Sequence, residues 1–404
     1  MIGISKLYCG AEEASDALRY GADGEGPSAA PAAPKPVVVW NCTRACNLRC
    51  VHCYATSANS DTETSYATDT GEVSTEAGLA MLEDLAQFGA PAVLFSGGEP
   101  LLRPDLFTLI ERASALGIRP VVSTNGTLID ERAAERLRDA GARYVGISLD
   151  GMRETNDRFR ACNGAFDRAL AGLRHCRHLG IKVGLRFTMM RHNAAEIDDI
   201  FSLVRDENIP RLCFYHLVYA GRASHLIHED LDHEGTRRAV DRIIDRTADL
   251  YAEGRTPEVL TVDNHADGPY LYLRLVRENH PRAEEALRLL RANGGNASGS
   301  RIAAVGWDGS VHPDQFWRHV SLGNVTERPF SEIWADGSHP LLDALRNRQA
   351  HLKGRCARCR FLDACGGNFR VRAETVTGDL WAPDPACFLT DEEIGVAANP
   401  EAIP

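Results

Sequence analysis

Six short runs rich in β-forming residues alternate with helical patterns in the first half of the chain. The runs are Val37–Trp40, Ala92–Phe95, Pro120–Ser123, Tyr144–Ile147, Val183–Phe187 and Leu212–Tyr215. This alternation predicts a parallel sheet with right-handed helical crossovers. Six units are too few to close an eight-stranded barrel, so we expect an α/β fold with an open, partial (β/α)6 TIM-like barrel. Its site should lie at the carboxyl ends of the strands. A doubly wound open sheet is the alternative fold.

The sequence pattern divides the chain into four parts. They are an N-terminal arm and linker at 1–36, a partial barrel at 37–235, a helical bridging segment at 236–299 and a small C-terminal domain at 300–395. Residues 21–36 are rich in proline and alanine, which is typical of an extended linker. Apolar spacing predicts one helix over 236–254 and another over 270–292. The pair Asp308-Gly309 between two apolar runs predicts a hairpin at the start of the last domain.

Composition places the chain among folded, non-membrane proteins. Of the 404 residues, 44% are hydrophobic and 25% are charged, and no apolar run approaches the length of a membrane span. The first residues lack the layout of a signal peptide, so we expect a cytoplasmic protein. The formal net charge is -11, which gives no global positive field for nucleic acid or an anionic membrane. An anionic ligand would therefore need a local group of arginines.

The chain contains twelve cysteines, and in a reducing compartment such a count favours metal ligands or catalytic thiols over disulfides. Cys46, Cys50 and Cys53 follow the first predicted strand, so three thiolates converge where a barrel binds its ligand. A zinc site takes four closed ligands, whereas a [4Fe–4S] cluster held by three cysteines leaves one iron open. We therefore expect an iron–sulfur cluster here, and zinc with Cys42 as fourth ligand is the alternative.

A second set of four cysteines lies in the small C-terminal domain: Cys356, Cys359, Cys365 and Cys387. Four thiolates would fill the coordination of a second [4Fe–4S] cluster, which suits electron transfer more than substrate binding. They would satisfy a structural zinc ion equally well, so a zinc ribbon is the alternative.

The spacing of the first three cysteines, C-x3-C-x2-C, resembles the signature of the radical S-adenosylmethionine (radical SAM) enzymes. The segment Gly97-Gly98-Glu99-Pro100 resembles their GGEP motif, although read alone it would be an ordinary turn. The resemblance implies that bare glycine backbone lets the methionyl ammonium approach, that Glu99 accepts its hydrogen bond and that Tyr54 lies by the adenine. The remaining cofactor contacts that it implies are Ser123, Thr124, Asn125, Ser148, Asp150 and Arg160.

The C-terminal cysteines resemble the SPASM-type domain, which carries auxiliary iron–sulfur clusters in radical SAM enzymes. The fuller SPASM pattern supplies seven cysteines for two clusters, and residues 214–355 contain no cysteine. We therefore expect one auxiliary cluster. The chemistry that the resemblance implies is reductive cleavage of S-adenosylmethionine to a 5′-deoxyadenosyl radical, which abstracts hydrogen from the substrate.

Further segments resemble the heme-biosynthetic branch of this superfamily. They are Met1–Gly10, Phe214–Arg222, Thr261–Gly268 and Asp314–Arg318. The resemblance implies an iron tetrapyrrole substrate, 12,18-didecarboxysiroheme, which loses two acetate arms to give iron-coproporphyrin III. It also implies a reducing electron donor such as a ferredoxin or flavodoxin. The alternative within this branch is the heme d1 pathway, in which propionates leave the same substrate.

A polycarboxylate iron macrocycle calls for arginine side chains and an axial imidazole. The candidate substrate contacts are Arg186, His216, Tyr219, Arg222 and His265. No acid or base of the protein is identified from the sequence. A non-catalytic iron–sulfur or heme carrier would explain both cysteine sets, but it would not explain the polar loops that face the first set. A peptide-modifying SPASM maturase would carry a leader-recognition domain, for which we expect 1–36 to be too short.

Overall fold

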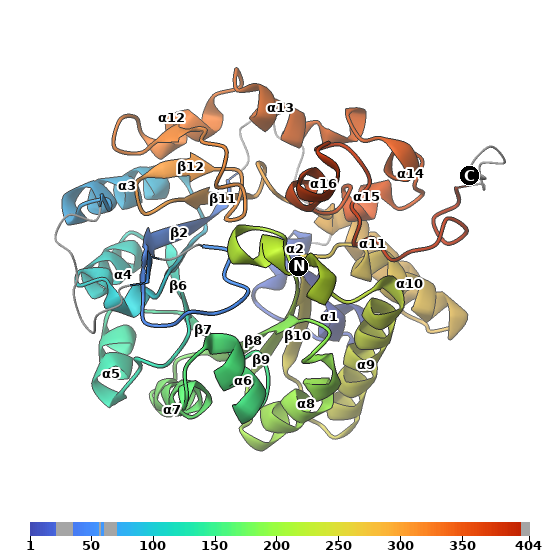
Figure 1. Ribbon diagram of the computed structural model, residues 1–404, viewed down its shortest axis with the longest axis horizontal. Helices are drawn as coiled ribbons and strands as arrows, with labels where there is room; N and C mark the ends of the chain where they lie inside the picture. Colours follow the sequence, from blue (N-terminus) through green and yellow to red (C-terminus); the bar gives the residue numbers. More distant parts are fainter. Residues whose placement is uncertain (22–34, 56–57, 60–70, 397–404) are drawn as a thin grey trace.

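A parallel sheet curved into an open barrel forms the centre of the computed structural model, which describes residues 1–21, 35–55, 58–59 and 71–396 (Figure 1). The six predicted runs all lie in parallel strands. These strands are β2 (Val37–Thr43), β5 (Ala92–Gly97), β6 (Arg119–Thr124), β7 (Tyr144–Ser148), β8 (Val183–Met189) and β9 (Arg211–His216). Neighbouring strands are consecutive along this series, as in a barrel built from successive βα units. The predicted partial barrel is confirmed.

Helices cover the outer face of the barrel, and Figure 1 shows them as a ring around the strands. They are α3 (Thr75–Phe88), α4 (Leu106–Ala115), α5 (Glu131–Asp139), α7 (Ala165–His178), α8 (Ile197–Asp206) and α9 (His233–Ala252). Side chains of Ser74, Asp130 and Asp232 cap α3, α5 and α9 by accepting a backbone N–H of the first turn. The apolar faces of the helices pack against the sheet in one continuous core.

The sequence pattern predicted a helical segment over 236–299, but this segment also contains a strand. It contains β10 (Glu258–Val262), a seventh parallel strand that pairs with β9. The predicted helix over 270–292 is two helices, α10 (Asp267–Arg277) and α11 (Ala283–Asn293). Pro281 lies between them, and a proline both lacks the helical N–H and disfavours helix in the residue before it.

The N-terminal arm is part of the barrel. Strand β1 (Ile2–Gly3) pairs antiparallel with β10, and the short helices α1 (Ile4–Cys9) and α2 (Asp16–Tyr20) follow it. Ile2, Ile4 and Leu7 are buried in the main core. Most of the predicted linker at 21–36 lies outside the described residues.

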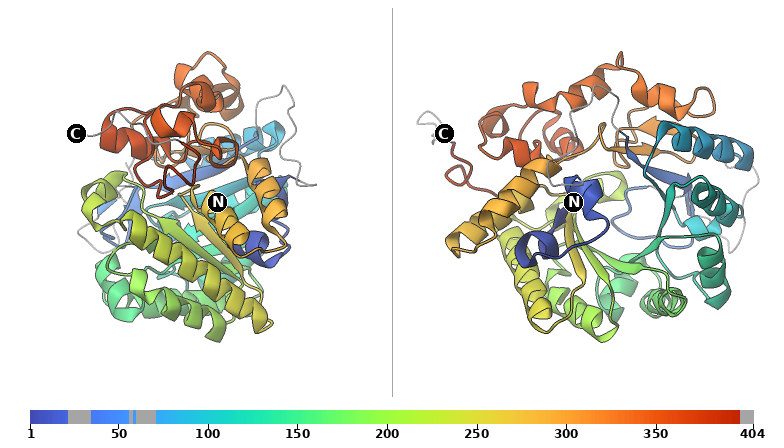
Figure 2. Two further views of the ribbon diagram at one scale, coloured as in Figure 1. Left: turned by 90° about the vertical axis from the view of Figure 1, so that its right-hand side faces the viewer. Right: turned by 180° about the vertical axis from the view of Figure 1, so that it is seen from behind.

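The C-terminal domain continues the barrel sheet. Strand β11 (Ile302–Val305) pairs parallel with β2, and β12 (Ser310–His312) completes the predicted hairpin, with Gly309 at φ +84°. Strand β13 (Gly323–Asn324) ends the sheet. Five short helices follow: α12 (Phe330–Ala335), α13 (Pro340–Arg346), α14 (Gly354–Ala357), α15 (Leu362–Cys365) and α16 (Arg370–Thr377). These elements lie together along one side of the barrel (Figures 1 and 2). No helix in the described parts of the chain is long and apolar enough to cross a membrane.

Candidate active site

A cavity of about 220 Å³ lies at the carboxyl ends of the barrel strands. It collects most of the residues predicted to hold the first cluster and its cofactor. Those that line it are Cys46, Cys50, Cys53, Tyr54, Gly97, Gly98, Ser123, Thr124, Asn125, Ser148, Asp150 and Arg160. Glu99 and Pro100 lie outside the lining. Loops that are distant in sequence therefore converge where the strand order predicts a site.

The cysteine loop places three thiols around this cavity. Burial raises the pKa of the Cys46 thiol to about 12, so the sulfur is a thiol unless a metal takes its proton. The Arg160 guanidinium donates to Cys50 Sγ at 3.4 Å, and the Leu48 N–H donates to Cys46 Sγ at 3.5 Å. Such donors stabilise the negative sulfur of an iron–sulfur cluster. The three thiols therefore fit the predicted group.

Cys42 is not placed as a fourth ligand. Its Sγ is fully buried in the core and donates to the Ser96 carbonyl at 3.2 Å. In the described parts of the chain, no three His, Cys, Asp or Glu side chains converge closely enough to hold one metal ion.

The two glycines of Gly97-Gly98-Glu99-Pro100 are required by the packing of two loops. The N–H groups of Gly98 and Glu99 donate to the carbonyls of Thr43 and Ala45, each at 2.8 Å. A Cβ atom on Gly97 would lie 2.4 Å from the Thr43 oxygen, and one on Gly98 would lie 2.0 Å from the Ala45 oxygen. The absence of side chains at Gly97 and Gly98 thus lets this loop pack closely against the segment that leads into Cys46. The motif also predicts that the cofactor approaches the same glycines.

The Glu99 carboxylate joins this motif to the loop after β6. It is fully buried and accepts from Thr124 Oγ1 at 2.7 Å, the Asn125 N–H at 2.8 Å and the Leu101 N–H at 3.2 Å. Burial raises the pKa of Glu99 to about 7. No cation of the described residues forms an ion pair with it. The carboxylate therefore lies next to residues that line the cavity. A cationic ligand bound there would lower the pKa of Glu99.

Asp150 and Arg160 form a buried ion pair beside the cysteines. The same carboxylate lies 3.3 Å from Nε2 of His52 and accepts the Thr188 N–H at 2.8 Å. Burial lowers the pKa of His52 to about 4, so its imidazole is neutral. His52 lies between Cys50 and Cys53, and no pattern in the sequence indicated its contact with Asp150.

Three of the five candidate substrate contacts line the cavity: Arg186, His216 and Arg222. Arg186 donates to Ser123 Oγ, and its Nε has no partner in the described chain. His216 Nε2 lies 2.8 Å from Asp267 Oδ2. Arg222 donates from its backbone N to the Cys53 carbonyl and from Nε to the Cys50 carbonyl, both at 2.9 Å. Arg222 thus also holds the cysteine loop.

Tyr219 and His265 are not brought to this cavity. Strand β9 ends at His216, so the alternation of side chains along the strand does not extend to Tyr219. The Tyr219 hydroxyl donates to Asp230 at 2.7 Å, beside a second cavity of about 530 Å³. His216 lines both cavities. The His265 ring stacks on Phe369 of the C-terminal domain, with the centroids 5.9 Å apart.

Sequence reasoning missed Asp263, which follows the unforeseen strand β10 and lines the main cavity. Its φ of +68° is left-handed, and burial raises the pKa of its carboxyl to about 7. The run Asp263-Asn264-His265 directly after the β-rich run Val259–Val262 was the available signal. Other lining residues that were missed include Thr188, Tyr215, Gln315 and Phe316.

The four C-terminal cysteines line a small apolar cavity of about 20 Å³. Its other lining residues include Phe361, Leu362, Leu389 and Ile394. Burial raises the pKa of the Cys387 thiol to about 12. Four thiols in an apolar setting fit a cluster whose irons are all ligated by the protein.

Comparisons with known proteins agree with this geometry. A family model described as "Radical SAM superfamily" matches residues 40–204, and one described as "Iron-sulfur cluster-binding domain" (SPASM) matches 297–360. The chain is 58% identical to Fe-coproporphyrin III synthase of Methanosarcina barkeri, over 98% of this chain and 99% of that protein. It is 46% identical to pre-heme d1 synthase of Dinoroseobacter shibae, over 92% and 91%.

Among solved structures, SuiB of Streptococcus suis bound to its precursor peptide SuiA matches with a TM-score of 0.68 at 17% identity. The match covers 89% of this chain and 76% of that one, and at this identity it supports the fold alone. The two relatives that match nearly the whole chain, together with the two family models, establish the family of this protein. The chain belongs to the radical SAM enzymes with a C-terminal SPASM iron–sulfur domain, in the family that includes Fe-coproporphyrin III synthase.

Proposed function

We propose that this enzyme is an Fe-coproporphyrin III synthase, which removes the two acetate arms of 12,18-didecarboxysiroheme. The observation that carries the proposal is the 58% identity to that enzyme of Methanosarcina barkeri over nearly the full length of both chains. The identity to pre-heme d1 synthase, 46%, supports a second candidate, in which propionates leave instead. A peptide substrate has weaker support, because PqqA peptide cyclase of Gluconobacter oxydans is 30% identical to this chain and mycofactocin maturase MftC of Mycobacterium ulcerans is also 30% identical.

The cavity suits a carboxylate-rich, iron-bearing ligand. In a chain of net charge -11, Arg160, Arg186 and Arg222 gather around one cavity, and Nε of Arg186 and Nη2 of Arg222 have no partner in the described chain. Planar guanidinium groups bind carboxylates in fixed geometry. The imidazole of His216 lies in the same wall, supported by Asp267. Arg186, Arg222 and His216 are the proposed substrate contacts, while Arg160 pairs with Asp150 beside the cysteines.

Each group of residues has a definite task in this proposal. Cys46, Cys50 and Cys53 hold the first cluster, which with bound S-adenosylmethionine supplies a 5′-deoxyadenosyl radical. The loops of Ser123–Asn125 and Ser148–Asp150 orient the cofactor, and the Glu99 carboxylate accepts a hydrogen bond from its ammonium group. Arg186 and Arg222 fix the macrocycle by its carboxylates, so that one arm is presented to the radical. Four C-terminal cysteines hold one auxiliary [4Fe–4S] cluster for electron transfer. The electron donor is a ferredoxin or flavodoxin of the cytoplasm.

Anaerobic turnover with 12,18-didecarboxysiroheme, read by mass spectrometry, tests this function. The expected product has lost two acetate arms and keeps its propionates, and 5′-deoxyadenosine accumulates alongside it. A product that keeps both acetates and has lost propionates would move the enzyme to the heme d1 branch. If 5′-deoxyadenosine forms but no tetrapyrrole is converted, the proposed substrate is wrong. The Cys46/Cys50/Cys53 triple alanine variant is the matched control, because it should form neither product.

A further inference from the structure

Arg372 and Asp384 form an ion pair whose two side chains are both fully buried. Arg372 lies on α16, and Asp384 lies three residues before Cys387 of the auxiliary site. The contact is bidentate: Nε donates to Oδ1 and Nη2 to Oδ2, each at 2.9 Å. Two buried charges are tolerated only when they are paired and fully hydrogen-bonded, so the remaining donors of Arg372 identify what the pair holds in place.

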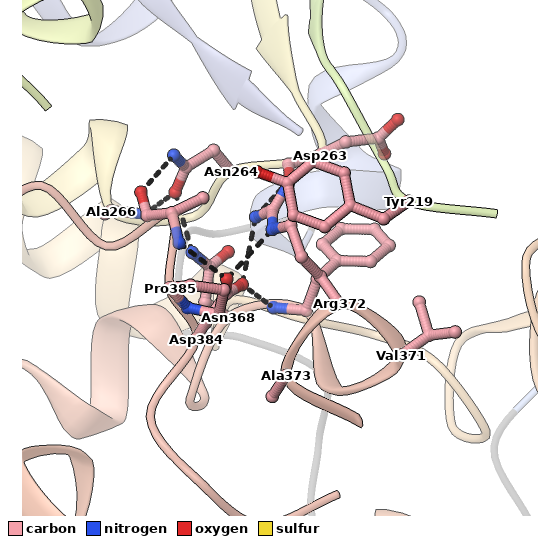
Figure 3. Close-up of polar contacts among 12 residues, drawn as sticks. Tyr219, Asp263, Asn264, Ala266, Asn368, Val371, Arg372, Ala373, Asp384 and Pro385 are labelled. Carbon is pink, nitrogen blue, oxygen red and sulfur yellow. Dashed lines mark hydrogen bonds and ion pairs between the residues drawn. The ribbon is translucent and has the colours of Figure 1, made fainter. Parts of the chain in front are cut away.

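Those donors connect the pair to the wall of the main cavity. Arg372 Nη1 donates to the Leu217 carbonyl at 2.9 Å. Its Nη2 donates to the Asp263 carbonyl at 3.0 Å (Figure 3). Leu217 follows the last residue of β9, and Asp263 follows the last residue of β10. Both residues line the main cavity. One guanidinium therefore joins two strand ends of the barrel to the loop that carries Cys387.

The Asp263 carbonyl that Arg372 contacts belongs to a turn with an unusual backbone. Its left-handed backbone, at φ +68°, is sparsely populated by residues other than glycine and persists only where neighbouring groups hold it. The carbonyl of Asp263 is turned to Arg372, while the carboxyl points away from the guanidinium (Figure 3) and lines the cavity. Within the described chain this carboxyl makes no hydrogen bond, and the cations that act on it include the N-terminal ammonium of Met1 and the Arg372 guanidinium. Its oxygens can therefore form a hydrogen bond with a ligand.

A second contact from the auxiliary domain holds the same loop. Asn368, three residues after Cys365, accepts the His265 N–H at 2.8 Å and donates to Asn264 Oδ1 at 2.7 Å. Asn264 in turn donates to the Ala386 carbonyl at 2.9 Å. Residues within three positions of Cys365 and Cys387 thus hold the loop Asp263–Ala266 from two sides.

We propose that Arg372 is a positioning residue that sets the turn at Asp263, and that the Asp263 carboxyl is a substrate contact that hydrogen-bonds the edge of the bound tetrapyrrole. Asp384 ties this arrangement to the Cys387 loop, so substrate register depends on the auxiliary domain. The inference rests on the proposed function. The proposal adds the Asp263 carboxyl to the arginines and the imidazole that were expected to contact the substrate. It also gives the buried pair Arg372–Asp384 a role in positioning the substrate.

A double-mutant cycle between the two residues tests the proposal. The variants are Asp263→Gly, which accepts the left-handed backbone without a side chain, Arg372→Lys, and the double variant. Two readouts are measured: product formed per 5′-deoxyadenosine, and the affinity for iron coproporphyrin III from the change in its absorption spectrum. Each single variant should lower the product ratio about tenfold and weaken porphyrin binding, because a displaced reacting group is heavily penalised.

If Arg372 acts through Asp263, the product ratio of the double variant should be at most about twofold below that of either single variant. Each single variant then already removes the same interaction, so the effects do not add. Additive losses would show that Arg372 is merely structural and would overturn the proposal. Unchanged product ratio and binding in Asp263→Gly would overturn it as well. Should Arg372→Lys fail to accumulate, Asp384→Asn takes its place in the cycle.

Arg19→Lys is the matched control. Arg19 is also a buried arginine paired with a carboxylate, Glu258, but this pair lies at the opposite end of β10 from Asp263. Its loss should change stability without changing the product ratio, and it should be additive with Asp263→Gly. The wild-type enzyme separates the two hypotheses: if it converts no tetrapyrrole, the proposed function fails and this inference with it. If it converts the substrate and Asp263→Gly does so with the same ratio, only this inference fails.

Discussion

At the scale of single residues, the buried Glu99 carboxylate governs how the site receives a cation. Burial raises its pKa to about 7, and its hydrogen bonds come from neutral donors. The methionyl ammonium would bind the ionised form, so protonation competes with binding. We therefore expect the affinity for S-adenosylmethionine to fall as the pH drops below about 7 and to level off above it. Equilibrium binding under anaerobic conditions, measured from pH 5.5 to 8.5, checks this.

Replacing Glu99 by glutamine should weaken binding of S-adenosylmethionine by about tenfold to a hundredfold, since a charge-assisted hydrogen bond contributes roughly 1.5–3 kcal/mol. The variant should also lose the pH dependence, because no proton then competes. Iron content is the control, since Glu99 also accepts from Thr124 and Asn125. An unchanged affinity with the pH dependence intact would mean that Gly97–Pro100 is only a turn.

Two arginines that were predicted to share one role differ in their contacts, and lysine variants should separate them. Arg222 donates to the carbonyl of Cys50 and holds the cysteine loop, whereas Arg186 contacts Ser123. Arg222→Lys should therefore lower both the iron content of the first site and turnover. Arg186→Lys should keep the iron and the uncoupled cleavage of S-adenosylmethionine, and lose about tenfold in turnover. Equal iron loss in both variants would contradict this distinction.

At the scale of elements, the cavity depends on how closely the loop after β5 approaches the loop after β2. A Cβ atom on Gly98 would lie 2.0 Å from the Ala45 carbonyl oxygen, which precedes Cys46. Gly98→Ala should push the loops apart, at a cost of about 1–3 kcal/mol, and lose most iron of the first site. Gly337→Ala is the matched control, because nothing lies within 4 Å of its added Cβ. Full iron content in Gly98→Ala would show that the two loops can separate freely.

The same scale shows what the sequence could and could not predict. Strands β2 and β5 to β9 were predictable because each is a run of β-forming residues between helical patterns. Strand β10 was missed because it begins with the charged Glu258. This residue is stabilised in the core by ion pairs with Arg19 and Arg211, which are distant from it in sequence. Missing β10 hid Asp263 as well. That Cys46, Cys50 and Cys53 lie at one cavity was predictable from their position after the first strand. The contact of His52 with Asp150 depends on the tertiary structure, so the sequence could not predict it.

At the scale of the whole molecule, the two cysteine sites belong to one sheet and one core. Strand β11 of the C-terminal domain pairs with β2, the strand that leads into Cys46, and the Cys359 and Cys387 side chains pack against the main core. The auxiliary site therefore is not an independent module. The loop Asp263–Ala266 is held by residues near Cys365 and Cys387, which places the second site in contact with the wall of the first cavity.

Iron content tests this organisation. Each thiol set fits one cubane of four irons, so the reconstituted enzyme should hold about eight. Replacing Cys46, Cys50 and Cys53 by alanine should leave about four irons, because the auxiliary thiols lie in a separate apolar cavity. Replacing Cys356, Cys359, Cys365 and Cys387 should also leave about four, but porphyrin binding should weaken, since the loop at Asp263 is then held less firmly. A triple variant that keeps eight irons would disprove the ligand assignment. Unchanged porphyrin binding in the quadruple variant would show that the two sites are independent.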